Sequence, residues 1–183
     1  MMTAYKAFAP GLICRGYQFK MGTNVTSDAN CARNGFHCAE DPIDCLTYYP
    51  DVHRAVYCLV KAGGDIDEDA VDSKIACTEL TILRVLSLRD YFLHILIYMA
   101  KHPNRGGRGR SRVSDDCTTA RNGYAIVRGR FPSARGELGD ILAMAQENAD
   151  GDIVEIAVHE VDGEKLRPGV YYDITGREVP ENE

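Results

Sequence analysis

The chain has 183 residues, of which 21 are Lys or Arg and 27 are Asp or Glu, so its formal net charge is −6. Hydrophobic residues make up 45% of the sequence and charged residues 26%. This is the composition of an ordinary globular protein, and it excludes a collagen-like, a wholly disordered or a channel-forming chain. A chain of this length can bury a core without a metal or disulfides, and we expect one domain, or one domain with a small appendage.

The cysteines predict a reducing environment. The first residues have no long apolar stretch behind a basic start, so no secretory signal is expected and the thiols should be free in the cytoplasm. Three cysteines recur every seven residues beside His37, but no C-x2-C or C-x4-C pair, typical of zinc sites, occurs. We therefore predict buried thiols and no metal site. The seven are Cys14, Cys31, Cys38, Cys45, Cys58, Cys77 and Cys117.

Residues 1–78 are predicted to form an N-terminal α+β module with a mixed sheet. Strand-like runs at 5–8, 12–19 and 54–61 are each bounded by Pro, Gly or Asp. Between the last two, Asp41 is a suitable N-cap and Pro42 a suitable first residue for a short helix. This helix should place Ile43, Leu46 and Thr47 in the core and end before Pro50.

Residues 79–103 are predicted to form one long helix. Five polar residues fall three, three, four and seven positions apart, so they would share one helical stripe: Arg84, Ser87, Asp90, His94 and Lys101. The longest uninterrupted apolar run, 95–100, is far shorter than the ~20 residues that cross a bilayer, so no membrane contact is expected. At the start of such a helix, Glu79 would favour the helix dipole.

Residues 104–117 read as a connector that contains the sequence RGGRGRSR. It is either a solvated linker or a loop that binds phosphate or carboxylate, through Arg105, Arg108, Arg110 and Arg112. No aromatic residue interleaves these arginines, so base stacking gains no support, although contact with nucleic acid stays possible. Without residues 105–112 the chain has 17 basic and 27 acidic residues, a net charge of −10. The pattern is that of an acidic body with one basic loop.

Residues 118–183 are expected to form a C-terminal antiparallel β-meander. Asp150-Gly151 is a strong hairpin signal between the apolar runs 138–146 and 153–161. The acidic tail from Pro180 to Glu183 is expected to be disordered. The whole chain is therefore predicted to be α+β, with an N-terminal mixed β-sheet and short helix, one long central helix, and the C-terminal meander.

No complete catalytic motif is found: the sequence lacks G-x-S-x-G, a P-loop, H-E-x-x-H and a dinucleotide G-x-G-x-x-G. Three polar residues between apolar runs remain as candidates, namely Arg15, His37 and Glu79. Each also has a structural interpretation. Arg15 could form an ion pair with Glu40 or Asp41, His37 could be a hydrogen-bonded residue at a strand end, and Glu79 could serve the helix described above.

The segments YKAF, CRGYQF, GFHCAEDPIDCLTYYP and SKIACTEL, with the β-like end DGDIVEIAVHEVDGEKLRPGVYY, resemble a family of uncharacterised phage and prophage proteins. The resemblance covers about residues 4–80 and 118–175 and implies a phage or mobile-element origin. We therefore expect an accessory protein without cofactor that binds and inhibits a host macromolecule in the host cytoplasm. Its most concrete form is an anti-CRISPR-like inhibitor of a nucleic-acid-targeting effector, whose partner is a host defence protein or nuclease complex. A component of the phage particle is a further possibility.

A second, narrower resemblance is to the layout of ADP-ribosyltransferases. It implies that Arg15 holds NAD, that His37 or Phe36 stacks on nicotinamide, and that Glu79 stabilises an oxocarbenium-like transition state. The chain departs from that pattern because it has neither a Ser-Thr-Ser strand nor a Glu-x-Glu pair. An enzyme that uses NAD to modify a host target is therefore the alternative to the inhibitor.

Overall fold

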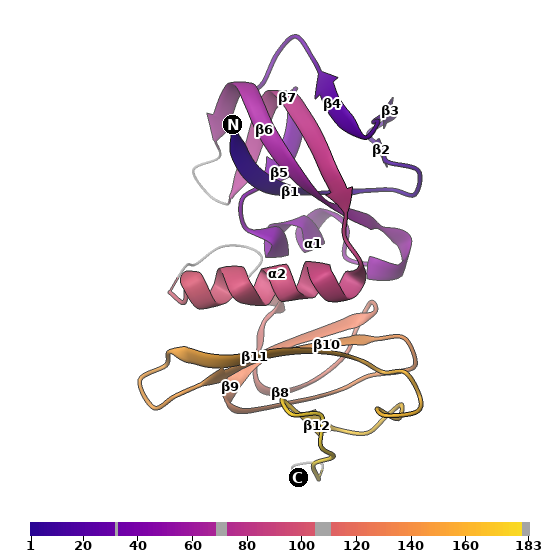
Figure 1. The fold of residues 1–183 in the computed structure, drawn as a ribbon, viewed down its shortest axis with the longest axis vertical. Coiled ribbons are helices and arrows are strands. Elements are labelled where there is room, and N and C mark those ends of the chain that lie inside the picture. Colours follow the sequence, from indigo (N-terminus) through magenta and orange to yellow (C-terminus); the bar gives the residue numbers. More distant parts are fainter. Residues whose placement is uncertain (32, 69–72, 105–110, 181–183) are drawn as a thin grey trace. The chain divides into compact units, whose positions relative to one another are not determined.

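The computed structural model describes residues 1–31, 33–68, 73–104 and 111–180. These residues divide into two compact units, an N-terminal unit of Met1–Ser87 and a C-terminal unit from Leu88 onward (Figure 1). Strands and helices occur together in the chain, so the α+β class is confirmed. The division falls nine residues after the expected boundary at 78/79.

The N-terminal unit is built on an antiparallel sheet whose order is β4-β7-β5-β1-β6. Because β6 pairs with β1 and also with β7, the strands β1, β5, β7 and β6 close into a ring. The expected mixed sheet was wrong, since the described pairings of this unit are all antiparallel. Its strands are β1 (Met2–Phe8), β2 (Ile13–Cys14), β3 (Tyr17–Gln18), β4 (Gly22–Val25), β5 (Phe36–Ala39), β6 (Val56–Glu68) and β7 (Lys74–Val85).

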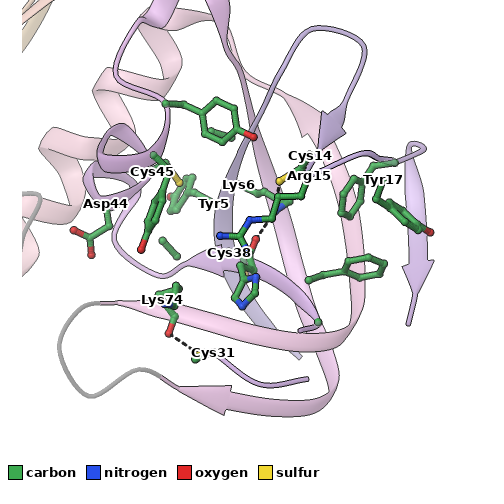
Figure 2. Close-up of a pocket in the computed structure, with 18 residues that line it drawn as sticks. Tyr5, Lys6, Cys14, Arg15, Tyr17, Cys31, Cys38, Asp44, Cys45 and Lys74 are labelled. Atoms are coloured by element: carbon green, nitrogen blue, oxygen red, sulfur yellow. Dashed lines mark hydrogen bonds between the residues drawn. The ribbon is translucent and has the colours of Figure 1, made fainter. Parts of the chain in front are cut away.

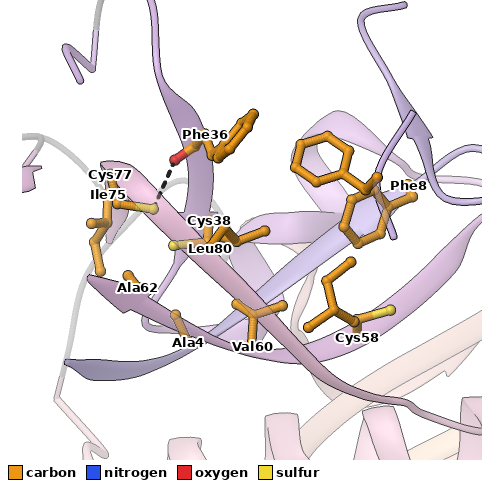
Figure 3. Close-up of a cluster of buried hydrophobic side chains, with 12 residues drawn as sticks. Ala4, Phe8, Phe36, Cys38, Cys58, Val60, Ala62, Ile75, Cys77 and Leu80 are labelled. Atoms are coloured by element: carbon orange, nitrogen blue, oxygen red, sulfur yellow. Dashed lines mark hydrogen bonds between the residues drawn. The ribbon is translucent and has the colours of Figure 1, made fainter. Parts of the chain in front are cut away.

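A core of aromatic, aliphatic and cysteine side chains fills this ring (Figure 3). Phe8, Val60 and Leu80 are fully buried in it, and they come from three different strands. Cysteine contributes as a small hydrophobic residue: Cys58 and Cys77 have no exposed surface, and Cys38 and Cys45 are buried as well. The prediction of buried thiols thus holds for these four, whereas Cys14 and Cys31 are half-buried and Cys117 is exposed.

The predicted short helix is confirmed, with the predicted cap. The side chain of Asp41 accepts a hydrogen bond from the backbone N of Ile43 at 3.2 Å, and Pro42 occupies the first position. A 3₁₀ turn η1 (Pro42–Asp44) continues into α1 (Cys45–Tyr48), and a further turn η2 (Val52–Arg54) leads into β6. Ile43 and Leu46 are buried, as the spacing predicted, whereas Thr47 is only half-buried.

The long helix predicted for residues 79–103 was wrong over its first nine residues. Residues from Glu79 to Val85 are the end of β7, and helix α2 (Leu88–Lys101) starts only at Leu88. Burial in this segment alternates with the two-residue period of a strand, and not with the period of a helix. Leu80 and Ile82 are buried, whereas Thr81 is only half-buried and Leu83 is exposed. β-Branched residues favour this pleated, half-buried surface. None of the described helices is both long and apolar enough to span a bilayer.

The C-terminal unit holds α2 and a second sheet of order β11-β10-β9-β12, with β8 also beside β9. The hairpin predicted at Asp150-Gly151 is confirmed by the antiparallel pair β10–β11. The antiparallel meander as a whole was wrong, because β8–β9 and β9–β10 are parallel pairs. The strands are β8 (Ser114–Thr119), β9 (Tyr124–Arg135), β10 (Ile141–Glu147), β11 (Ile153–Glu160) and β12 (Tyr172–Asp173).

The parallel pairing follows from the length of β9. Its first half, up to Gly129, pairs with β10 in parallel, its second half pairs with β12 at Ser133 and Ala134, and β8 pairs with both halves. A short link between two strands normally indicates an antiparallel hairpin. Here the second half of β9 leads the chain back toward the start of its first half, so that β10 can begin beside Tyr124 and run parallel to it. The run Ile141–Ala145 is buried throughout, because α2 packs against β10 while Val161, Leu166 and Tyr172 cover Leu142 and Met144. Strands buried on both faces are continuously apolar.

Candidate functional site

A pocket of about 580 Å³ opens in the N-terminal unit (Figure 2). Residues of β1, of the β2–β3 hairpin, of β5 and of the η1–α1 segment line it. Its volume is that of a small-molecule site, for which about 300–1,000 Å³ is usual. The pocket therefore has the size for a ligand of the nucleotide class.

Arg15 reaches this pocket from the tip of a hairpin. The predicted strand over residues 12–19 is in fact the two short strands β2 and β3, and Arg15 and Gly16 form the turn with φ values of 49° and 78°. Two positive φ values are the signature of a tight hairpin turn. Arg15 is exposed, and within the described residues it forms no ion pair with Glu40 or Asp41, the interpretation considered above. Its guanidinium is thus available to a ligand.

His37 lies in β5 and faces the same pocket. Its Nε2 donates to the carbonyl oxygen of Asn30 at 3.3 Å, because a carbonyl can only accept. Burial lowers the pKa of His37, and the nearby charges of Lys6, Lys74 and Arg15 lower it further against the opposing hydrogen bond to Asn30. The imidazole is therefore neutral at pH 7, with Nδ1 as a hydrogen-bond acceptor.

Lys6 is the residue of the pocket that sequence reasoning missed. It is 5% exposed, and its ammonium lies over the rings of Phe8 and Phe19 at 5.2 and 5.3 Å from their centroids. Its Nζ donates to the carbonyl oxygen of His37 at 2.6 Å and to the sulfur of Cys14 at 3.7 Å. No carboxylate in the described part of the chain forms an ion pair with it. The available signal was the alternation in β1, where Ala4, Lys6 and Phe8 share the inward face.

The remaining charges of the pocket make it basic. Lys74, at the start of β7, is a third cation in the lining, and Asp44 is the acidic side chain that the described lining contains. Asp44 is buried and accepts hydrogen bonds from the backbone N and the hydroxyl of Ser73, at 3.1 and 2.6 Å. The positive charge of the pocket thus exceeds the negative charge.

Aromatic rings form one side of the pocket. The ring centroid of Tyr17 lies 4.6 Å from that of Phe19 and 5.0 Å from that of Phe36. Tyr48, which is 50% exposed, and Tyr49 line it from the α1 segment. Burial raises the pKa of Tyr49, and a hydrogen bond to Cys14 raises it further, so the phenol stays protonated. Rings beside cations suit a ligand that has both a planar ring and a negative charge.

The structure brings Arg15 and His37 together, but it does not bring Glu79 to them. Glu79 lies in β7, opposite Val25 of β4 and Gly63 of β6, and does not line the pocket. It is a strand residue, so its predicted place in the first turn of a helix was wrong as well.

The predicted partner-binding arginines are largely outside the described residues. This holds for Arg105, Arg108 and Arg110. Arg112 is described: it is half-buried, and its Nη1 donates to the hydroxyl of Tyr124 at 3.1 Å within the C-terminal unit. The described residues contain no group of His, Cys, Asp or Glu side chains that could hold a metal ion.

In the comparisons with known proteins, a family model matches the N-terminal half of the chain. No curated protein and no solved structure matches the chain. A family model, described as "Domain of unknown function (DUF7666)", matches residues 2–94, just over half of the chain, and includes the whole pocket lining. The protein belongs to the DUF7666 family.

Proposed function

We propose that the N-terminal unit binds a small phosphorylated ligand of the nucleotide class in the pocket around Lys6. The observation that carries this proposal is the buried Lys6 ammonium, which has no carboxylate partner among the described residues. Burying a charge without an opposite charge costs several kcal/mol, of the order of the penalty for a buried ion. A bound anion would offset this cost, because a phosphate supplies the missing negative charge.

The other basic side chains fit the same ligand. Arg15 offers a planar fork that binds phosphate oxygens in pairs, and Lys74 adds a second ammonium to the lining. Cations at three positions of the lining, Lys6, Arg15 and Lys74, suit the several negative charges of a diphosphate better than the one charge of a carboxylate. The neutral His37 would then accept a hydrogen bond at Nδ1 from a ribose hydroxyl.

The aromatic side of the pocket would hold the base. Tyr17, Phe36 and Tyr48 line it, and stacking of a base on an aromatic side chain is worth about 1–3 kcal/mol. NAD has both a diphosphate and two planar rings, so it fits the basic and the aromatic sides of the pocket. It is also the cofactor that the resemblance to ADP-ribosyltransferases implies for Arg15 and His37. We propose binding and not ADP-ribosyl transfer, since Glu79 does not line the pocket.

Calorimetry on the full chain tests the proposal. NAD, ADP and ATP are the probes, with adenosine to report the contribution of the base and pyrophosphate that of the charge. We expect Lys6→Met to weaken the binding of ADP and pyrophosphate at least about tenfold, because one charge pair is lost from a low-dielectric site. Lys61→Met is the matched control, since Lys61 is exposed on β6 and does not line the pocket. Absence of heat and of thermal stabilisation at millimolar concentrations of all three nucleotides would contradict the proposal.

A second candidate function is the predicted inhibition of a host nucleic-acid-targeting effector in the host cytoplasm, by a protein of phage or mobile-element origin. The observation that favours it is a set of exposed acidic side chains at the turn of the β10–β11 hairpin and the start of β11, namely Asp150, Asp152 and Glu155. Such a surface can compete for a basic nucleic-acid groove through complementary charge. We expect the full chain to capture a nuclease complex from host lysate, and Asp150→Lys with Asp152→Lys to lose it. Repeated capture without a stoichiometric nuclease would count against this function.

A further inference from the structure

Cys14 places a nucleophilic sulfur in the lining of the basic pocket. It is the last residue of β2, is half-buried and lines the pocket. Its sulfur accepts a hydrogen bond from Nζ of Lys6 at 3.7 Å, drawn as a dashed line in Figure 2. A charged donor therefore points at the sulfur.

The other cysteines of the pocket have environments that keep them protonated or occupied. Burial raises the pKa of Cys45 to about 12. A hydrogen bond with Cys77, together with burial, raises the pKa of Cys38 well above its ordinary value. The thiol of Cys31 donates to the carbonyl oxygen of Asp67 at 2.9 Å. Cys14 differs from all three, because its sulfur contacts the cation of the pocket.

The charge around Cys14 selects the kind of reagent that would reach it. Lys6 contacts the sulfur, Arg15 is the next residue in the chain, and Lys74 lines the same pocket. A basic cleft with low-dielectric walls raises the local concentration of anions and repels cations. The volume of about 580 Å³ leaves room for a molecule of tripeptide size beside the sulfur.

We propose that Cys14 is a site of reversible S-thiolation by small anionic disulfides. The Cys14 thiolate attacks one sulfur of the disulfide, a new bond forms between that sulfur and Sγ of Cys14, and the original S–S bond breaks. The second half of the reagent leaves as a thiolate. It takes up from water a proton equivalent to the one that the Cys14 thiol released, so the disulfide supplies the only oxidising equivalent. The ammonium of Lys6 and the guanidinium of Arg15 hold the carboxylates of the incoming reagent.

Three disulfides of different charge test the proposal on the full chain. These are oxidised glutathione, which is anionic, 2-hydroxyethyl disulfide, which is neutral, and cystamine, which is cationic. The rate at each cysteine is followed by peptide mass spectrometry under native conditions. Cys117 is the internal reference, because it is exposed in the C-terminal unit and does not line the pocket. We expect the anionic-to-cationic rate ratio to be at least about tenfold higher at Cys14 than at Cys117.

Variants separate the site from its surroundings. Cys14→Ser should abolish the pocket modification, whereas Cys31→Ser should leave it unchanged, because the thiol of Cys31 bonds to the backbone carbonyl oxygens of Asp67 and Lys74. Lys6→Met should reduce the anionic-to-cationic rate ratio at Cys14 toward that of Cys117. Increasing salt should do the same in the unaltered chain, and this second test does not depend on whether the variant folds. Dithiothreitol should restore the original mass. Modification confined to Cys117, or a charge ratio equal at both cysteines, would overturn the proposal. Neither result depends on nucleotide binding, so the two proposals fail separately.

Discussion

The ammonium of Lys6 donates a 2.6 Å hydrogen bond to the carbonyl oxygen of His37, 31 residues further along the chain. Strands β1 and β5 share a single register pair, Tyr5 opposite Ala39, so this bond is a second link between them. It also fixes a positive charge beside the imidazole of His37, on the wall of the pocket. The pH dependence of the protein should therefore carry a contribution from this pair.

The first prediction concerns the stability of the fold below neutral pH. The pKa of His37 is lowered in the folded chain, by burial first and then by Lys6, Lys74 and Arg15, whereas in the unfolded chain it is near 6.5. Below pH 6.5 the unfolded state binds a proton that the folded state does not, so the free energy of unfolding falls until the pH reaches the folded pKa. Above pH 6.5 the contribution is fully present.

Urea unfolding of the wild type and of His37→Gln between pH 5 and 8 measures this contribution. The difference between the two chains isolates His37 from the other titrating groups. We expect the wild type to lose more stability than the variant as the pH falls from 7 to 5. Parallel curves for the two chains would show that the imidazole titrates equally in both states.

The second prediction concerns Arg15, whose φ of 49° is costly for a residue with a Cβ atom. The left-handed conformation costs about 1 kcal/mol per residue, and Asn tolerates it better than Arg. Arg15→Asn should therefore keep or slightly raise the melting temperature while it lowers ADP affinity about tenfold, the effect of one lost charge contact. Arg54→Asn is the control, because Arg54 is exposed and does not line the pocket. Unchanged affinity in a folded Arg15→Asn variant would remove Arg15 from the site.

Local signals allowed part of this architecture to be predicted. Asp41 and Pro42 start a helix through a side-chain hydrogen bond and a missing N–H, both of which depend only on neighbouring residues. The Asp150-Gly151 hairpin is equally local. In contrast, the pairing of Glu79 with Gly63 in the β6–β7 ladder depends on residues that no sequence window contains. The local pattern from Glu79 onward therefore predicts a helix, although the segment pairs as a strand with β6.

The pocket shows the same limit. Arg15 and His37 could be selected because charged or titratable residues inside apolar runs are unusual. That they share a pocket, and that Glu79 does not, follows from which strands are neighbours across the sheet. Lys6 is harder to select from the sequence, because it stands in a short strand. A single lysine in such a strand usually belongs to an exposed edge of a sheet. Its burial is the consequence of β1 being paired on both sides, by β5 and β6.

The third prediction tests the bend at which β6 and β7 change register. Gly64 has a φ of 68°, and a Cβ atom added there would lie 2.1 Å from Oγ1 of Thr78, which accepts a hydrogen bond from Asp65 N at 2.8 Å. Gly64→Ala should lower the free energy of unfolding by about 2–4 kcal/mol, through overpacking and the left-handed backbone together. Gly22→Ala is the matched control, since Gly22 has a φ of 84° but no atom within 4 Å of an added Cβ. It should cost about 1 kcal/mol. Equal costs for both would mean that the backbone alone, and not the contact with Thr78, sets the penalty.

The fourth prediction concerns the buried network behind the pocket. The hydroxyl of Ser73 donates to Oδ2 of Asp44 at 2.6 Å and accepts from the backbone N of Asp41 at 2.9 Å, and all three residues are buried. Ser73→Ala removes both bonds and leaves a buried carboxylate and a buried N–H with fewer partners. Loss of a bond to a charged, buried acceptor costs about 1.5–3 kcal/mol.

Thr23→Ala is the control for this prediction, because its hydroxyl also forms one side-chain hydrogen bond, to Thr81 at 3.0 Å, but at an exposed position. Chemical denaturation should show a change within about 0.5 kcal/mol for Thr23→Ala. If Ser73→Ala were equally mild, another donor such as water would have to replace the hydroxyl at Asp44, and the two Ser73 bonds would add little to the stability of the fold. A clear loss in Ser73→Ala alone would instead show that the hydroxyl of Ser73 holds the Asp44 carboxylate and the Asp41 backbone in place.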